Sequence, residues 1–121
     1  MARSSYRISE QETPIYTFTL KDEEGAPIAA SSLTTATLTL YAVPSGTILN
    51  SRNGQSILNT NNVTISELGV VTWTLQVNDV KILDDTKRIE VHRALFLFTW
   101  GSNRSKPHEV DLEIDNLGKL L

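Results

Sequence analysis

The chain has 121 residues, a formal net charge of −3 and no cysteine. A chain of this length forms one domain with a substantial core, and the lack of cysteine excludes disulfides, thiol catalysis and zinc–thiolate sites and fits synthesis in a reducing cytoplasm. The mild negative charge, with Lys and Arg scattered along the sequence, argues against general binding of nucleic acid, which needs a basic stripe.

Residues 1–14 predict an extended N-terminal arm. This segment is rich in Ser, Glu, Gln and Arg, and its apolar anchors are Tyr6 and Ile8. The first six residues are polar and lead into no apolar run, so we expect neither a signal peptide nor a membrane anchor. We expect the arm to dock elsewhere, on the domain or on a neighbouring molecule.

Four segments before residue 76 predict strands, because apolar residues alternate with polar ones or form short β-branched and aromatic runs. Turn residues, including Asp22, Gly25 and Pro27, separate these segments. The predicted strands are residues 15–20, 34–43, 63–66 and 70–75.

Two short features lie between and after these strands. The pair Asn53-Gly54 is a strong hairpin signal, since both positions tolerate positive φ, and it predicts a weak hairpin between residues 47–50 and 55–58.

Asn78 is expected to cap a single helical turn over residues 79–83. In that turn Val80 and Leu83 would be buried and would plug one end of the domain.

A long hairpin over residues 90–114 is the predicted centre of the fold. Residues 94–100 form an almost unbroken apolar run that ends at Gly101, too short to cross a membrane, and therefore predict a central strand. The return strand alternates with a period of two, which predicts one buried and one solvated face. Its apolar residues are Val110, Leu112 and Ile114, and its acidic residues are Glu109, Asp111, Glu113 and Asp115.

The register of this hairpin follows from a loop centred on Asn103. Leu95 and Leu97 then lie on the outer face, beside acidic residues of the return strand. We expect two leucines that are flanked by acidic residues to be buried by another segment. That segment belongs either to the same chain or to another subunit. The register predicts three cross-strand pairs: Phe96 with Val110, Ala94 with Leu112, and Arg93 with Glu113.

The expected fold is all-β. Turn signals recur about every 8 to 12 residues and no segment has a convincing amphipathic helical pattern, which indicates an antiparallel β-sandwich of immunoglobulin-like or jelly-roll-like type. We expect an arm over residues 1–14, a sandwich domain over 15–115 and a C-terminal tail over 116–121. The expected functional site is an interface that loses solvent exposure on assembly. Its predicted members are Tyr6, Ile8, Leu95, Leu97, Leu117, Leu120 and Leu121.

The titratable residues do not suggest a catalytic or metal site. His92 and His108 lie too far apart on the predicted hairpin to share a metal, so we interpret both as surface or edge residues. Same-face residues of the acidic return strand stand nearly 7 Å apart, too far for one calcium ion, which favours a solvated face. Asp79, Asp84 and Asp85 lack the spacing of a calcium-binding loop.

Enzymatic motifs are also missing from the sequence. It has neither a Gly-x-Ser-x-Gly elbow nor a Gly-rich phosphate loop followed by lysine, so we expect no enzyme and no cofactor. Carbohydrate binding through aromatic residues is an alternative, although aromatic residues at strand positions are more often buried. The residues considered are Tyr6, Tyr16, Tyr41, Trp73 and Trp100.

The order of several segments carries a resemblance to a known family. These segments are residues 16–22 (YTFTLKD) with Gly25, Pro27 and Ile28, residues 37–40 (TLTL), residues 68–71 (LGVV), and Pro107 with Val110, Leu112 and Ile114. The chain resembles the small immunoglobulin-like β-sandwich modules of tailed-phage virion proteins, such as the N-terminal domain of baseplate upper proteins. The resemblance covers residues 15–114, and it departs from the family at residues 89–92 (IEVH), where those modules tend to carry Gly and Tyr.

The resemblance implies a non-enzymatic structural role in the virion after synthesis in the host cytoplasm. A chain with a polar arm and an apolar tail looks most like a capsid decoration, or cement, protein that bridges capsomers as a homo-oligomer, with a trimer as a common form. By binding only the assembled shell, such a protein stabilises that shell through mass action. The implied partners are the major capsid protein or tail proteins, with no nucleic acid or membrane. The alternatives are a tail or baseplate component and, from another class, a carbohydrate-binding module.

Overall fold

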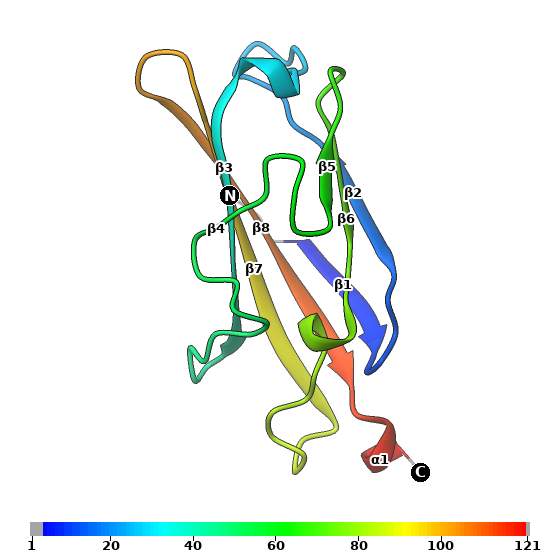
Figure 1. The fold of residues 1–121 in the computed structure, drawn as a ribbon. Coiled ribbons are helices and arrows are strands. Elements are labelled where there is room, and N and C mark those ends of the chain that lie inside the picture. Colours follow the sequence, from blue (N-terminus) through cyan, green and yellow to red (C-terminus); the bar gives the residue numbers. More distant parts are fainter. Residues whose placement is uncertain (1–3, 121) are drawn as a thin grey trace.

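Two β-sheets pack face to face in residues 4–120, the part of the chain that the computed structural model describes, with side chains described for residues 5–118 (Figure 1). One sheet has five strands in the order β1-β8-β7-β3-β4, and the other has three in the order β2-β6-β5. The predicted all-β sandwich is confirmed. The strands are β1 (Ser4–Ser9), β2 (Ile15–Thr19), β3 (Leu33–Val43), β4 (Gln55–Ser56), β5 (Val63–Ile65), β6 (Val70–Thr74), β7 (Ile89–Trp100) and β8 (Arg104–Asp115). The helical segments are the 3₁₀ turns η1 (Ala30–Ser32) and η2 (Val77–Asp79) and the short helix α1 (Leu117–Leu120).

Aromatic rings from both sheets meet in the core. Trp73 of β6 and Phe18 of β2 contact Phe96 of β7 edge-on, with ring centroids 5.6 and 5.2 Å away. Trp73 and Phe96 are fully buried. Each such side chain stabilises the fold by roughly 1.5–3 kcal/mol relative to an exposed one, so this cluster locks the two sheets together.

The β7–β8 hairpin forms as predicted, but its register differs by two residues. Ala94 pairs with Val110, and Trp100 pairs with Arg104, across a three-residue turn. Gly101 and Asn103, the first and last residues of that turn, both have positive φ, which shortens the loop relative to the predicted one. A shift of two residues keeps every side chain on its predicted face, since strand side chains alternate with a period of two.

Each of the three predicted cross-strand pairs therefore has the wrong partner, although every residue lies on its predicted face of the sheet. Phe96 lies opposite His108, Ala94 opposite Val110, and Arg93 opposite Asp111. The Nε of Arg93 donates to Oδ1 of Asp111 at 2.9 Å, which replaces the expected pair with Glu113.

The predicted N-terminal arm is a strand of the five-stranded sheet. β1 lies parallel to β8, with Tyr6 opposite Leu112 and Ile8 opposite Ile114. Ile8 is only 3% exposed, so its side chain belongs to the core of its own domain. The arm is extended, as expected, but the chain itself covers its apolar residues.

The predicted hairpin around Asn53-Gly54 does not form. Both of its arms lie against β3 instead: the N–H of Ala42 donates to the carbonyl of Thr47 at 2.9 Å, and β4 pairs with β3. Positive φ at Asn50 and Ser51 turns the chain before the Asn-Gly pair. This turn places the side chain of Arg52 in the interior, whereas a simple hairpin would have left that side chain exposed.

The helical turn begins two residues earlier than predicted. η2 is capped by Gln76, whose N–H donates to Oδ2 of Asp79 at 2.8 Å, so Asn78 is within the turn and not its cap. Val80 is buried as expected, whereas Leu83 is exposed and does not plug the sandwich.

Candidate functional site

Most of the exposed large apolar side chains of the described residues gather at one end of the sandwich. This end, in the lower part of Figure 1, is formed by the β1–β2 turn, the loop after β3, η2 with the segment that leads to β7, and α1. Exposed apolar side chains that lie close together mark an interaction surface more often than scattered ones do. We call this surface the apolar end; its members are Ile15, Ile48, Val77, Leu83, Ile89 and Leu117.

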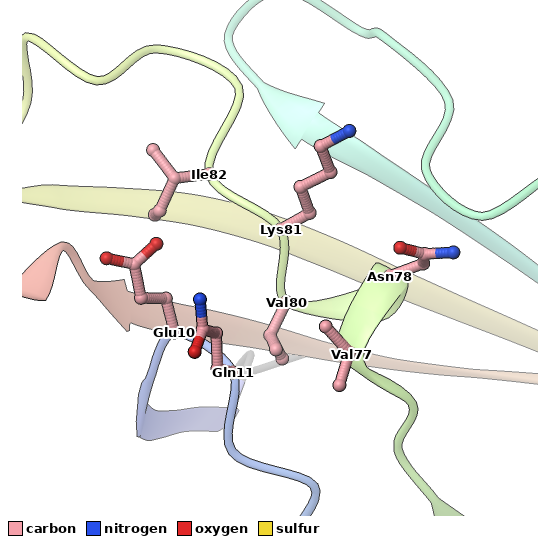
Figure 2. A pocket seen from close by; sticks show the side chains of 7 residues that line it. All are labelled: Glu10, Gln11, Val77, Asn78, Val80, Lys81 and Ile82. Carbon is pink, nitrogen blue, oxygen red and sulfur yellow. The ribbon is translucent and has the colours of Figure 1, made fainter.

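A pocket of about 360 Å³ opens in the apolar end, between the turn after β1 and the segment around η2 (Figure 2). Val77 and Ile82 line its sides, and the fully buried Val80 lies beneath. In Figure 2 the side chain of Lys81 extends away from Glu10 and Gln11. The full lining is Glu10, Gln11, Val77, Asn78, Val80, Lys81 and Ile82.

A second hollow of about 410 Å³ adjoins the first, and Asn78 and Lys81 line both. Ile48 and Leu83 contribute the apolar part of its lining. The apolar end therefore has two depressions with a lysine between them. This surface shape is better suited to binding a protein that has apolar projections and an acidic group than to enclosing a small molecule.

A buried ion pair supports the apolar end from below. The Nε of Arg52 donates to Oδ1 of Asp79 at 2.7 Å, and Nη2 donates to Oδ2 at 3.2 Å. The remaining donors of Arg52 contact the side chain of Gln55 and the carbonyl of Asn61, at 2.8 and 3.1 Å. Because Arg52 and Asp79 are fully buried and bonded on all sides, the pair is structural and unavailable to a ligand.

A second buried pair holds the loop before β7. Burial opposes ionisation of Glu90, but hydrogen bonds from His92, the Asp84 amide and the Leu83 amide outweigh it and lower the pKa of Glu90. Glu90 is therefore a carboxylate at neutral pH. The other ring nitrogen of His92, Nδ1, lies 3.0 Å from the carbonyl of Asp79. Through its two ring nitrogens, His92 therefore links the Glu90 side chain to the backbone of η2.

Both histidines were expected at the surface or at an edge, and the prediction is wrong for His92. His92 is fully buried in the ionic network. His108 is half-buried and stacks on Phe18, with ring centroids 3.8 Å apart and planes 10° apart. Its Nε2 lies 2.8 Å from the hydroxyl of Tyr16, and burial together with Lys106 lowers the pKa of His108. A period-two pattern does place residues 92 and 108 on the inner face, and that signal could have located them.

The predicted interface residues separate into three groups. Leu95 and Leu97 lie on the outer face of β7, where Leu97 is 41% exposed and is flanked by Pro107 and Thr37 on the neighbouring strands. Tyr6 is partly buried against Tyr16, and Ile8 is buried in the core.

In the tail, the structure places the exposed Leu117 at the apolar end, where its N–H donates to Oε1 of Glu10 at 2.9 Å. The side chain of Leu120 and all of Leu121 lie outside the described residues. The tail and the outer strand face therefore present exposed leucines, whereas the arm does not.

The sequence patterns did not reveal the buried ion pair or the apolar end. The spacing Gln76-x-x-Asp79 is typical of a helix N-terminus, and it could have moved the predicted turn to its observed position. The apolar end has no comparable signal, because its members come from four separate segments of the chain.

Among the described residues, no cluster of three or more His, Asp or Glu side chains is arranged to hold a metal ion. None of the helices in this part of the chain has the length and hydropathy needed to cross a membrane. The sequence matches no protein-family model, and no curated protein matches it either.

Proposed function

We propose that this chain is a non-enzymatic structural protein of a tailed-phage virion, of the capsid decoration type. It binds the assembled shell and stabilises it by mass action, because a ligand that binds only the assembled state shifts the equilibrium toward that state. Its partner is the major capsid protein, and it needs no cofactor.

The apolar end carries this proposal. Three of its exposed apolar side chains, Ile48, Val77 and Leu83, line two depressions. A buried network of Arg52, Asp79, Glu90 and His92 holds the underlying loops in one conformation. A preorganised surface loses little conformational entropy on binding, which favours tight association. The outer face of β7 around Leu97 is a second contact surface of the same kind.

A tail or baseplate component is the second candidate within the same class, and the fold and the apolar end fit it equally. The carbohydrate-binding alternative finds less support, because Trp73 is fully buried and the rings of Tyr6 and Tyr16 are partly buried against the core. Trp100 is also buried, and it lies beneath the guanidinium of Arg104. Sugar binding on a sheet face needs rings that are open to solvent.

Co-sedimentation with phage capsid shells and with isolated tails tests the proposal. The purified chain should pellet with shells, and Leu83→Asp at the apolar end should abolish that binding. Leu68→Asp is the matched control, since Leu68 is 73% exposed and lies outside the apolar end. Binding to tails alone would select the second candidate. If the chain pellets with neither assembly, the virion role is wrong.

A further inference from the structure

Strand β2 presents an unpaired edge of the three-stranded sheet. The N–H of Leu20 donates to the carbonyl of Gly69 at 2.7 Å, and that of Leu75 donates to the carbonyl of Pro14 at 3.0 Å. Even-numbered residues of this segment thus turn their backbone groups toward β6. Ile15, Thr17 and Thr19 turn theirs to the opposite side, where no hydrogen bond reaches them from within the described part of the chain.

Each of the other three sheet edges carries one side-chain cap. On β1, Glu12 accepts from the N–H of Ser9 at 2.6 Å. On β4, the amide of Asn61 donates to the carbonyl of Ser56 at 2.7 Å, and on β5 the side chain of Asn59 accepts from the N–H of Ile65, also at 2.7 Å. Proteins commonly block exposed edges in this way, since an open edge pairs with other strands. Within residues 4–120, β2 is the edge without such a cap.

The sequence of β2 favours pairing with another strand and lacks residues that would block such pairing. Residues 15–19 (IYTFT) contain no charge, proline or glycine and consist of β-branched and aromatic residues. Ile15 is 58% exposed, and the side chains of Tyr16 and Phe18 are half-buried at the rim of the core. An edge with these properties is expected to be covered by another strand.

We propose that β2 pairs with β2 of a second copy, antiparallel and about a two-fold axis through Thr17. The two three-stranded sheets become one sheet of six strands in the order β5-β6-β2-β2-β6-β5. This inference rests on the strand edge and not on the virion proposal, and it makes the oligomer a dimer in place of the trimer that the family resemblance implies.

The geometry of β2 is complementary to itself in this register. The outward-facing backbone groups of Thr17 meet those of the partner's Thr17, and those of Ile15 meet those of the partner's Thr19, which gives about six hydrogen bonds for a five-residue overlap. On the outer face the Ile15 side chain packs beside the methyl group of the partner's Thr19. On the inner face Tyr16 lies opposite the partner's Phe18 and extends the aromatic core across the interface.

A second copy is favoured over an unrelated strand by symmetry and charge. Because β2 is uncharged, the two-fold axis brings no like charges together, which is the usual penalty for self-pairing. The side chains that face each other across the axis, Ile15 with the partner's Thr19 and Tyr16 with the partner's Phe18, also fit each other in size. A two-fold contact also closes on itself, so it ends in a dimer and does not propagate into a fibre.

Sedimentation equilibrium on the full chain, over a wide concentration range, measures this association. We expect a monomer–dimer equilibrium for the unmodified chain. Thr17→Pro removes the central N–H donor and fills its place with the ring, and it should raise the dissociation constant about a hundredfold or more. The proline fits the fold of the monomer, since this N–H faces solvent there. Ser56→Pro, at the outward-facing edge of β4, is the matched control and should leave the dimer intact.

Opposite charges at the two-fold axis identify the residue in contact. Thr17→Lys and Thr17→Glu should each be monomeric, because two like charges would then face each other, and a mixture of the two variants should form a one-to-one heterodimer. Failure of the unmodified chain to dimerise up to millimolar concentration would overturn the proposal. So would a trimer, a dimer that withstands Thr17→Pro, or a mixture that stays monomeric. The result for shell binding has no bearing on any of these outcomes.

Discussion

The guanidinium of Arg52 lies fully buried against the carboxylate of Asp79, with Nε and Oδ1 2.7 Å apart. This contact joins the loop after β3 to η2, two segments of the apolar end that are separated by three strands in the sequence. A buried ion pair does not add much stability relative to a well-packed apolar pair, but each partner is necessary once the other is present. The apolar end therefore depends on a pair of charges that no ligand touches.

Removal of one member of this pair should be much worse than removal of both. Arg52→Met leaves the Asp79 carboxylate buried without its partner and should lower the free energy of unfolding by about 3–5 kcal/mol. The double variant Arg52→Met, Asp79→Leu should recover most of that loss. Urea unfolding measures both, and a single variant that is as stable as the parent would contradict the structural role.

Glu90 should make the fold sensitive to acid. Its pKa in the folded chain lies below the ordinary value of 4.5, so the unfolded chain binds the proton first as the pH falls. The stability that Glu90 contributes is complete above pH 4.5 and is lost as the pH falls through the folded pKa. Glu90→Gln should be less stable at neutral pH and should show a smaller loss of stability below pH 4.5. Urea unfolding across this pH range measures it, with the exposed Glu24→Gln as a control that should follow the parent.

His108 should affect the stability of the fold over a higher pH range than Glu90 does. Burial lowers its pKa below the ordinary value of 6.5, so protonation favours the unfolded chain, and the stability present above pH 6.5 declines as the pH falls below that value. His108→Gln should be less stable at neutral pH because it loses the stack on Phe18. The same variant should lack the decline that begins near pH 6.5, whereas a decline identical to that of the parent would assign it to another group.

Gly69 should tolerate alanine far less well than Gly54. Both have positive φ, but a Cβ at Gly69 would lie 2.8 Å from the carbonyl oxygen of Leu20 and 3.1 Å from backbone atoms of Ile28, whereas a Cβ at Gly54 meets open space. Gly54→Ala should cost about 1 kcal/mol through backbone strain alone. Gly69→Ala should cost roughly 2–4 kcal/mol, since the clash adds to the strain. Equal losses in thermal or urea unfolding would show that the backbone around Gly69 moves to make room.

Leu97→Asp should separate folding from association. The side chain is 41% exposed on the outer face of β7, so the core and the unfolding curve should hardly change. Binding to the shell should weaken by about 2–4 kcal/mol, because a carboxylate would be buried there without a partner. Thr35→Asp, on the same face of β3, is a control at the margin of that surface. Unchanged shell binding would remove the β7 face from the interface.

Periodicity alone determined which residues of the long hairpin face the core. Val110, Leu112 and Ile114 lie inside as predicted, and Leu97 lies outside, although the predicted register was wrong by two residues. The reason is that the side-chain period of a strand is two, so hydrophobic alternation specifies the face but leaves the register open by even steps. The all-β class and most strand positions follow from the same alternation and from the turn residues.

Only the tertiary structure decided the fate of the polar residues and of the arm. Nothing local distinguishes Arg52 from a surface residue, because its burial depends on an acidic partner 27 residues away in the chain and on loops that close over it. Likewise, Ile8 could have been covered by any apolar surface, and the unpaired side of β8 provided it. The apolar end and the open edge of β2 depend on how segments distant in sequence meet. Local sequence patterns do not contain information about these distant contacts. They do indicate which side chains of each strand face the core and which face solvent.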